Sequence, residues 1–179
     1  MNDNSTGIPD DVAERVGALL DMCKRRKIMI ATAESCTGGL VSGTLTAISG
    51  SSAMLDRGYV TYSNEAKSDL LGVPADMIER NGAVSGEVAA AMAEGALARA
   101  NADLTIAVTG IAGPEGGTDL KPVGLVWFGC AANWAPTFVH KTVFPNEGRA
   151  FVRHAAVMTA IEILTETAKL APEPKAAED

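Results

Sequence analysis

The sequence contains few of the residues that build metal sites and disulfide frameworks. Its 179 residues include two histidines and three cysteines. The cysteines, Cys23, Cys36 and Cys130, are odd in number and widely spaced, which is typical of a reducing compartment and argues against a disulfide framework. No pair of them has the spacing of a metal site, so we expect no metal. Aromatic residues make up only 4% of the chain, so aliphatic side chains must build the core.

The chain also lacks a basic face and a long apolar run. Its net charge is −7, which argues against a general nucleic-acid binder. One arginine or lysine in a pocket can still hold the phosphate of an anionic substrate. No apolar run approaches the length of a membrane span, and the polar start MNDNSTGIPDD does not resemble a signal peptide. We therefore expect a soluble, cytoplasmic protein with no nucleic-acid or membrane partner.

What is present fits one α/β domain. Hydrophobic residues make up 47% of the chain, enough for a sizeable core. Hydrophobic periodicity predicts strands and helices in the following order: a helix at 10–26, a strand at 28–33, a helix at 40–49, a strand at 58–64, helices at 65–72, 74–82 and 85–101, strands at 104–110, 123–132 and 136–144, and a helix at 147–169. The short link between the last two strands favours an antiparallel hairpin. This order predicts a three-layer α/β/α domain with a mixed sheet at residues 10–169, with flexible tails at 1–9 and 170–179.

The stretch ATAESCTGG is the first candidate for chemistry. It joins a strand to a helix, and ligands of open α/β sheets collect beyond the carboxyl ends of strands. Its helix start could also hold an oxyanion. The alternative is that Ser35 or Thr37 is simply an N-cap of the helix, and on spacing alone capping is the simpler interpretation. The known phosphate motifs GxxxxGK[ST] and GxGxxG are absent. Glu34, at the strand end, could act as a base or accept a hydrogen bond from a ribose hydroxyl, but we expect it to be half-exposed and inert.

A serine nucleophile would need a base. His140 and His154 come late in the chain and suit surface or packing roles, and the absence of GxSxG argues against an α/β-hydrolase. A lysine whose pKa is lowered by burial is the other available base. Lys67 is the candidate, because it follows the second strand at the sheet edge where the first strand ends, with Tyr62 and Asn64 nearby. The alternative for Lys67 is a solvated side chain on a short helix.

Three further segments carry candidate residues. Ser51 and Ser52 in GSSAM are turn or capping residues, or a second serine site. Thr109 and Gly110 end an apolar strand, and the glycines that follow permit a ligand to approach the backbone. The loop after them is long enough to be a lid, or is a flexible connection. Arg149 opposes the dipole at the start of the last helix, which favours an anion-binding role.

Four motifs, in order, resemble the C-terminal domain of the CinA family: TAESCTGG, GSSAMLDRGYVTYSNEAK, GAVS and VTGIAGPEGG…KPVG. The resemblance covers residues 10–169. The stand-alone form of the family is a nicotinamide-nucleotide amidase, which converts nicotinamide mononucleotide into nicotinic acid mononucleotide and ammonia. The resemblance implies a mixed, mostly parallel five-stranded α/β/α sandwich, a small-molecule nucleotide substrate and no cofactor. We expect a homodimer, because the small-residue helix at 85–100 would pack closely against the sheet or a second copy.

The resemblance also implies roles for individual residues. Ser35 matches the nucleophile and Lys67 its base, while Ser52 matches a second serine that could be the nucleophile instead. The remaining implied site residues are a supporting hydroxyl on Tyr62 and substrate contacts at Thr109 and Arg149. From the pattern of the residues we further expect oxyanion donors in the turn Thr37, Gly38 and Gly39, and substrate contacts at Asn64 and Gly110. Two alternatives stay open. The domain could be a non-catalytic nucleotide-binding module, or it could hydrolyse a different amide or a phosphoanhydride.

Overall fold

The computed structural model describes residues 6–173. Within them the chain forms a five-stranded sheet, six α-helices and one 3-10 helix. In chain order these are α1 (Asp10–Arg26), β1 (Ile30–Glu34), α2 (Leu40–Thr46), η1 (Ser51–Ala53), β2 (Leu55–Val60), α3 (Asn64–Leu71), α4 (Ala75–Asn81), α5 (Gly86–Arg99), β3 (Leu104–Gly110), β4 (Leu125–Ala132), β5 (Ala135–Val143) and α6 (Arg149–Lys169).

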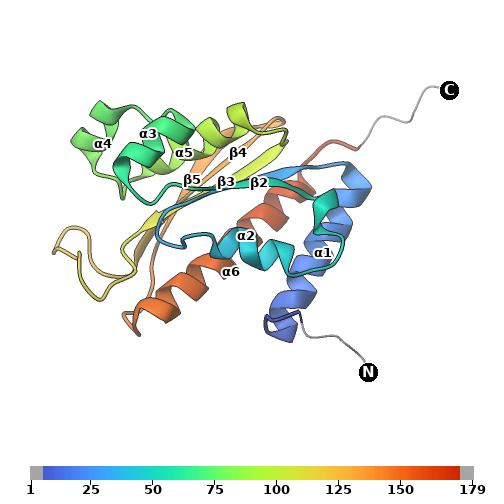
Figure 1. The fold of residues 1–179 in the computed structure, drawn as a ribbon, viewed down its shortest axis with the longest axis horizontal. Helices are drawn as coiled ribbons and strands as arrows, with labels where there is room; N and C mark the ends of the chain where they lie inside the picture. The colour runs from blue at the N-terminus through green and yellow to red at the C-terminus, as the bar shows by residue number, and fades with distance from the viewer. Residues whose placement is uncertain (1–5, 174–179) are drawn as a thin grey trace.

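The sheet is mixed and lies between two helical layers. Its strand order is β2-β1-β3-β4-β5. β1 pairs in parallel with β2 and β3, whereas β4 is antiparallel to both β3 and β5, so four of the five strands run in one direction. Helices α3, α4 and α5 cover one face, and α1, α2 and α6 cover the other (Figure 1). The predicted α/β/α sandwich with an antiparallel hairpin is therefore confirmed.

One strand boundary that bears on the site was predicted wrongly. The second strand runs from Leu55 to Val60, not over residues 58–64. It ends early because Ser63 already caps α3: its hydroxyl accepts a hydrogen bond from the N–H of Ala66 at 3.0 Å. A Ser N-cap satisfies a free donor of the first helical turn. The chain therefore turns back over the sheet as soon as β2 ends, which brings Lys67 close to the strand ends.

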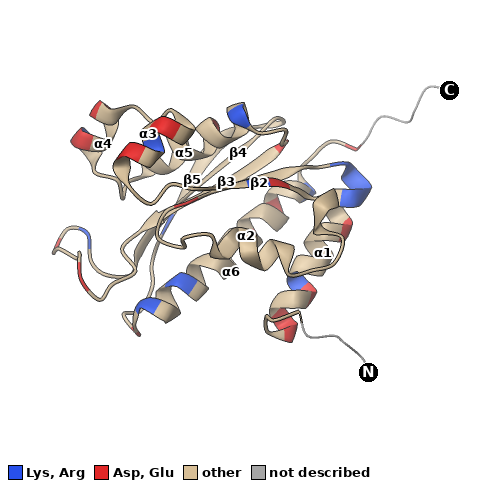
Figure 2. Cartoon of the chain, viewed as in Figure 1, with Lys and Arg blue, Asp and Glu red and all other residues tan. Residues whose placement is uncertain are grey.

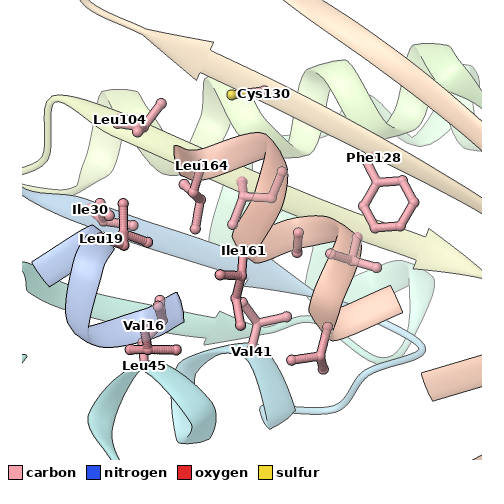
Figure 3. Close-up of a cluster of buried hydrophobic side chains, with 14 of the residues drawn as sticks. Val16, Leu19, Ile30, Val41, Leu45, Leu104, Phe128, Cys130, Ile161 and Leu164 are labelled. Carbon is pink, nitrogen blue, oxygen red and sulfur yellow. The ribbon is translucent and has the colours of Figure 1, made fainter. Parts of the chain in front are cut away.

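Alternating side chains of the strands enter two separate cores. Ile30 of β1 belongs to the larger cluster, which also holds Leu19 and Ile161 from α1 and α6 (Figure 3). Ala33 belongs to the smaller cluster on the opposite face, against α3, α4 and α5. Because side chains of a strand alternate in direction, Glu34 at the end of β1 faces the α2 layer. Ser35, the next residue, then faces the layer that contains α3.

The chain ends lie partly outside the described residues. The predicted tails at 1–9 and 170–179 include residues 1–5 and 174–179, which the structure does not describe. Among the described residues of the second segment, Ala171 is buried and Glu173 forms an ion pair with Arg26 at 3.1 Å. No helix between residues 6 and 173 is long and apolar enough to cross a membrane.

Candidate active site

The carboxyl ends of β1 and β2 bring Ser35 and Lys67 together. Ser35 directly follows β1, and Lys67 lies in α3, which follows β2. The two strands are parallel neighbours, so both ends lie at the same edge of the sheet. The Ser35 hydroxyl oxygen and the Lys67 Nζ are 3.1 Å apart. This is hydrogen-bonding distance, and it is the arrangement that a serine activated by a lysine requires.

Lys67 is buried and its amine is oriented by backbone carbonyls. The residue is 1% exposed, and Nζ lies 2.9 Å from the Thr61 carbonyl oxygen and 3.3 Å from that of Ser63. Burial lowers the pKa of Lys67, while nearby Cys36 and Glu65 oppose the shift. A neutral amine has two N–H groups and one lone pair. With the two carbonyls accepting the N–H groups, the lone pair is left for the hydroxyl of the serine.

The N-terminus of α2 is capped by a carboxylate, not by Ser35 or Thr37. Glu34 was expected to be half-exposed and inert, but it is fully buried. Its Oε2 accepts hydrogen bonds from the N–H groups of Gly39 and Val41, each at 3.0 Å. Its Oε1 accepts from the N–H of Ser42 at 2.9 Å and from its hydroxyl at 2.7 Å. The prediction failed because α2 folds back over the strand end, which no local pattern reveals.

This cap also changes which N–H groups could bind an oxyanion. The N–H of Gly38 donates to the Ser35 carbonyl at 3.0 Å, and that of Gly39 donates to Glu34. Both groups, predicted as oxyanion donors, therefore hold the turn instead. Over residues 6–173, the N–H groups of Cys36 and Thr37 find no main-chain or carboxylate acceptor. These two donors directly follow the serine.

Thr37 is buried beside the serine. Its hydroxyl has no hydrogen-bond partner in the part of the chain that the structure describes. Its carbonyl accepts a hydrogen bond from Nη2 of Arg153 at 2.8 Å. Most buried polar groups have a partner, so this unpaired hydroxyl beside the serine is an exception.

Arg149 joins three segments at the same edge of the sheet. Its Nη2 donates to the Tyr62 hydroxyl at 2.9 Å, and its Nη1 donates to the Gly113 carbonyl at 3.0 Å. Tyr62 was expected to support Lys67, but its hydroxyl lies on the arginine. Both side chains are exposed, so the guanidinium is accessible to an anion. Arg153 follows one turn along α6, and Figure 2 shows this basic pair near the start of the helix.

Thr109 and Gly110 have structural partners. The Thr109 side chain is buried, and its hydroxyl donates to the Ala83 carbonyl at 2.8 Å. Ala83 lies in the GAVS segment between α4 and α5. A Cβ at Gly110 would lie 2.7 Å from the Leu125 carbonyl oxygen. The glycine therefore permits close packing of β3 on β4, a reason different from the predicted approach of a ligand.

Two predicted site residues lie elsewhere. Ser52 is exposed in η1, immediately before β2, whereas Ser35 and Lys67 follow the opposite ends of the strands. The six residues of β2 separate the two ends by about 20 Å. Asn64 lines a cavity of about 460 Å³ between α3 and α4, and neither Ser35 nor Lys67 is among the residues that line it. Over residues 6–173, neither the Ser52 nor the Asn64 side chain forms a hydrogen bond with the serine–lysine pair.

Two basic residues near the site were missed in the sequence. Arg153 lies one helical turn after Arg149, and this spacing could have identified it. Lys121, in the loop between β3 and β4, donates to the carbonyls of Asn81 and Val84 at 2.7 and 2.8 Å. It holds that loop against the α4–α5 connection, and no sequence signal indicates these partners. Among the described residues, no group of three or more His, Cys, Asp or Glu could hold a metal ion.

Comparison with known families agrees with the motifs and the fold. A family model described as the CinA C-terminal domain matches residues 10–168. The chain belongs to this family. Within the family, a solved structure of the competence/damage inducible protein CihA from Agrobacterium tumefaciens is 45% identical in sequence, with a TM-score of 0.87. That match covers 90% of this chain and 98% of the solved one.

The relatives with similar sequences differ in length. Over 159 residues, the chain is 45% identical to the nicotinamide-nucleotide amidohydrolase PncC of Enterobacter agglomerans, covering 89% of this chain and 95% of that protein. It is 54% identical over 119 residues to a CinA-like protein of Colwellia psychrerythraea, covering 66% of this chain. The matched part is 27% of the Colwellia protein. The chain therefore spans almost all of the first relative and about a quarter of the second.

Proposed function

We propose that the protein is a nicotinamide-nucleotide amidase, which hydrolyses the carboxamide of nicotinamide mononucleotide to nicotinic acid mononucleotide and ammonia. The relative named nicotinamide-nucleotide amidohydrolase, at 45% identity over nearly its whole length, supports this substrate and reaction. The observation that supports the chemistry is the 3.1 Å separation between the Ser35 hydroxyl and the buried Lys67 amine.

The first half of the reaction forms an acyl-enzyme. Neutral Lys67 takes the proton of the Ser35 hydroxyl as its oxygen attacks the carboxamide carbon. The N–H groups of Cys36 and Thr37 stabilise the negative charge that develops on the carbonyl oxygen. Lys67 then gives its proton to the leaving nitrogen, the C–N bond breaks and ammonia departs.

The second half releases the acid. Lys67, neutral again, takes a proton from a water molecule, which attacks the ester carbon. The bond to Ser35 breaks, and its oxygen recovers a proton from Lys67. Because the Tyr62 hydroxyl accepts a hydrogen bond from Arg149, we assign Tyr62 to substrate binding and not to proton transfer.

The substrate phosphate needs a local positive charge, since the whole chain carries a net charge of −7. Arg149 is exposed at the site edge and presents its guanidinium with Tyr62. A guanidinium binds phosphate through two parallel hydrogen bonds. We assign the phosphate to Arg149, with Arg153 adding positive charge one turn further along α6.

The organisation of the protein is part of the same proposal. It is a single domain at residues 10–169 that works in the cytoplasm as a homodimer, without nucleic-acid or membrane partners. The edge strand β5 supports the dimer, because Phe138 and Val139 are each 43% exposed there. Light scattering on the purified protein measures the mass, and a monomer at micromolar concentration contradicts the dimer.

Product analysis tests the function. Purified, chelator-treated protein is incubated with nicotinamide mononucleotide, and ammonia, nicotinic acid mononucleotide and phosphate are measured. We expect equal amounts of ammonia and the acid, and no phosphate. Binding of the nucleotide by calorimetry without any product would favour the nucleotide-binding module. Phosphate release would favour a different hydrolase.

A further inference from the structure

Glu34 takes no step in the proposed mechanism, yet it is the residue that precedes the serine. We propose that Glu34 is a positioning residue, which holds Ser35 and the N–H groups of Cys36 and Thr37 in their reactive arrangement. This inference rests on the proposed function. The carboxylate of Glu34 bonds to Thr32, Gly39, Val41 and Ser42 and not to Lys67, so it would act through the turn between β1 and α2.

The main chain fixes one end of this turn. The carbonyl of Glu34 accepts a hydrogen bond from the N–H of Thr61 at 2.8 Å, and the N–H of Ser35 donates to the Val108 carbonyl at 2.9 Å. The backbone at Ser35 is therefore held by the segment after β2 on one side and by β3 on the other.

The carboxylate of Glu34 fixes the other end. It accepts hydrogen bonds from the N–H groups of Gly39, Val41 and Ser42, and from the Ser42 hydroxyl. A further contact at 3.3 Å comes from the Thr32 hydroxyl. Between the two anchors, the turn has two internal backbone bonds, from the Gly38 N–H to the Ser35 carbonyl at 3.0 Å and from the Leu40 N–H to the Thr37 carbonyl at 3.3 Å. Arg153 adds one contact, to the Thr37 carbonyl. Without the carboxylate, the free N–H groups of the turn would lose their fixed direction.

The hydrogen-bond donors around Glu34 require a side chain that only accepts hydrogen bonds, and a carboxylate meets this requirement. Four strong donors converge on two oxygens, and an ionised carboxylate is acceptor-only at both. A glutamine has the same shape, but its NH₂ group would face N–H donors. The substitution Glu34→Gln therefore removes half of the cap while leaving the volume unchanged. Ser42→Ala removes a single donor and gives a smaller perturbation of the same cap.

Steady-state kinetics with nicotinamide mononucleotide is the first readout. We expect Glu34→Gln to lower kcat by about 10- to 100-fold, since small misplacement of reacting groups costs this much. KM and the pH midpoint of kcat stay near the parent values, because Arg149 and the surroundings of Lys67 are intact. Ser42→Ala lowers kcat less. Val16→Ala, in the remote core of α1, is the control for lost stability and keeps the parent kcat at a temperature where both variants are folded.

Labelling by a fluorophosphonate is the second readout, and it does not depend on the natural substrate. The Ser35 oxygen forms a bond to phosphorus, the P–F bond breaks, fluoride leaves and Lys67 takes the serine proton. We expect Glu34→Gln to be labelled more slowly than the parent and Val16→Ala. A parent that is labelled at Ser35 but releases no ammonia contradicts the proposed function, and the labelling rates still test Glu34.

Parent-like labelling and turnover in Glu34→Gln would overturn the positioning role. So would a loss of kcat no larger than that of Val16→Ala at equal melting temperature. If Glu34→Gln does not fold, Ser42→Ala decides: a parent-like kcat and labelling rate in that variant overturn the proposal, and a lowered kcat at unchanged KM supports it.

Discussion

At the scale of single residues, the proposed chemistry depends on a lysine whose surroundings favour the neutral amine by lowering its pKa. Lys67 is buried, and the two carbonyls of Thr61 and Ser63 orient its amine toward Ser35. Burial disfavours the ammonium form, which is why the pKa of Lys67 falls below its ordinary value of 10.5. The chemistry of the serine is therefore set by side chains and carbonyls that lie far apart in the sequence.

The lowered pKa of Lys67 predicts two pH dependences. The kcat for ammonia release rises with pH through the pKa of Lys67 and is level above it, because only the neutral amine can accept a proton.

Folding stability also rises with pH between that lowered pKa and 10.5, since the unfolded chain still holds the proton there while the folded protein has released it. Thermal unfolding over a pH series checks this. Lys67→Met should lack this rise and be inactive; an identical pH dependence in the variant would contradict the assignment.

Arg149 makes a separate prediction about substrate choice. We expect Arg149→Ala to raise KM for nicotinamide mononucleotide by about 10- to 100-fold, the value of one or two hydrogen bonds to a charged group. KM for nicotinamide riboside, which has no phosphate, should change little. Steady-state kinetics on both substrates measures the difference. An equal loss on both would place Arg149 at the carboxamide or in the fold, and not at the phosphate.

At the scale of elements, α3 is held in place by close packing on α5. A Cβ at Gly95 of α5 would lie 2.0 Å from the carbonyl oxygen of Leu71 at the end of α3. The glycine lets the two helices approach, and this contact in turn supports the position of Lys67 in α3. The small residues of α5 also pack against the sheet, where a Cβ at Gly129 of β4 would lie 2.1 Å from the Ala89 carbonyl oxygen. Packing against the sheet was one of the two alternatives that the sequence left open.

Two matched glycine substitutions test this packing. In the exposed interior of a helix, alanine is more stabilising than glycine by about 1 kcal/mol. Gly17→Ala in α1, where no atom lies within 4 Å of the added Cβ, should raise the melting temperature. Gly95→Ala should lower the melting temperature and kcat together, because α3 must move. A rise in melting temperature for both variants would contradict the packing argument.

The elements also show what local patterns can predict. Apolar periodicity identified α1 and β3 with their observed ends, because both bury a continuous stripe or run of side chains. It misplaced β2, since the Ser63 cap ends that strand early. Glu34 was misjudged for a related reason: its partners in α2 lie five to eight residues further along, and only the fold shows where that helix begins.

At the scale of the whole molecule, the topology assembles the site at one edge of the sheet. Parallel pairing of β1 with β2 and β3 places Ser35, Lys67 and Thr109 at the same ends of the strands. Two hydrogen bonds hold the β3–β4 loop: Lys121 of the loop donates to the Asn81 carbonyl, and Arg149 donates to the Gly113 carbonyl of the loop. Order of elements and sheet type were predictable from the sequence. The partners of Tyr62, Arg149 and Lys121 were not, because each contact joins segments separated by long loops or whole elements.

The same topology separates the two candidate serines, and ammonia release by Ser35→Ala and Ser52→Ala shows which of them attacks the substrate. Both variants lose one hydroxyl, but of the two serines only Ser35 is within hydrogen-bonding distance of Lys67. We expect Ser35→Ala to lose turnover by at least about 10³-fold, as for a nucleophile, while Ser52→Ala keeps the parent rate. Parent-like release by a folded Ser35→Ala, or loss only in Ser52→Ala, would contradict this expectation.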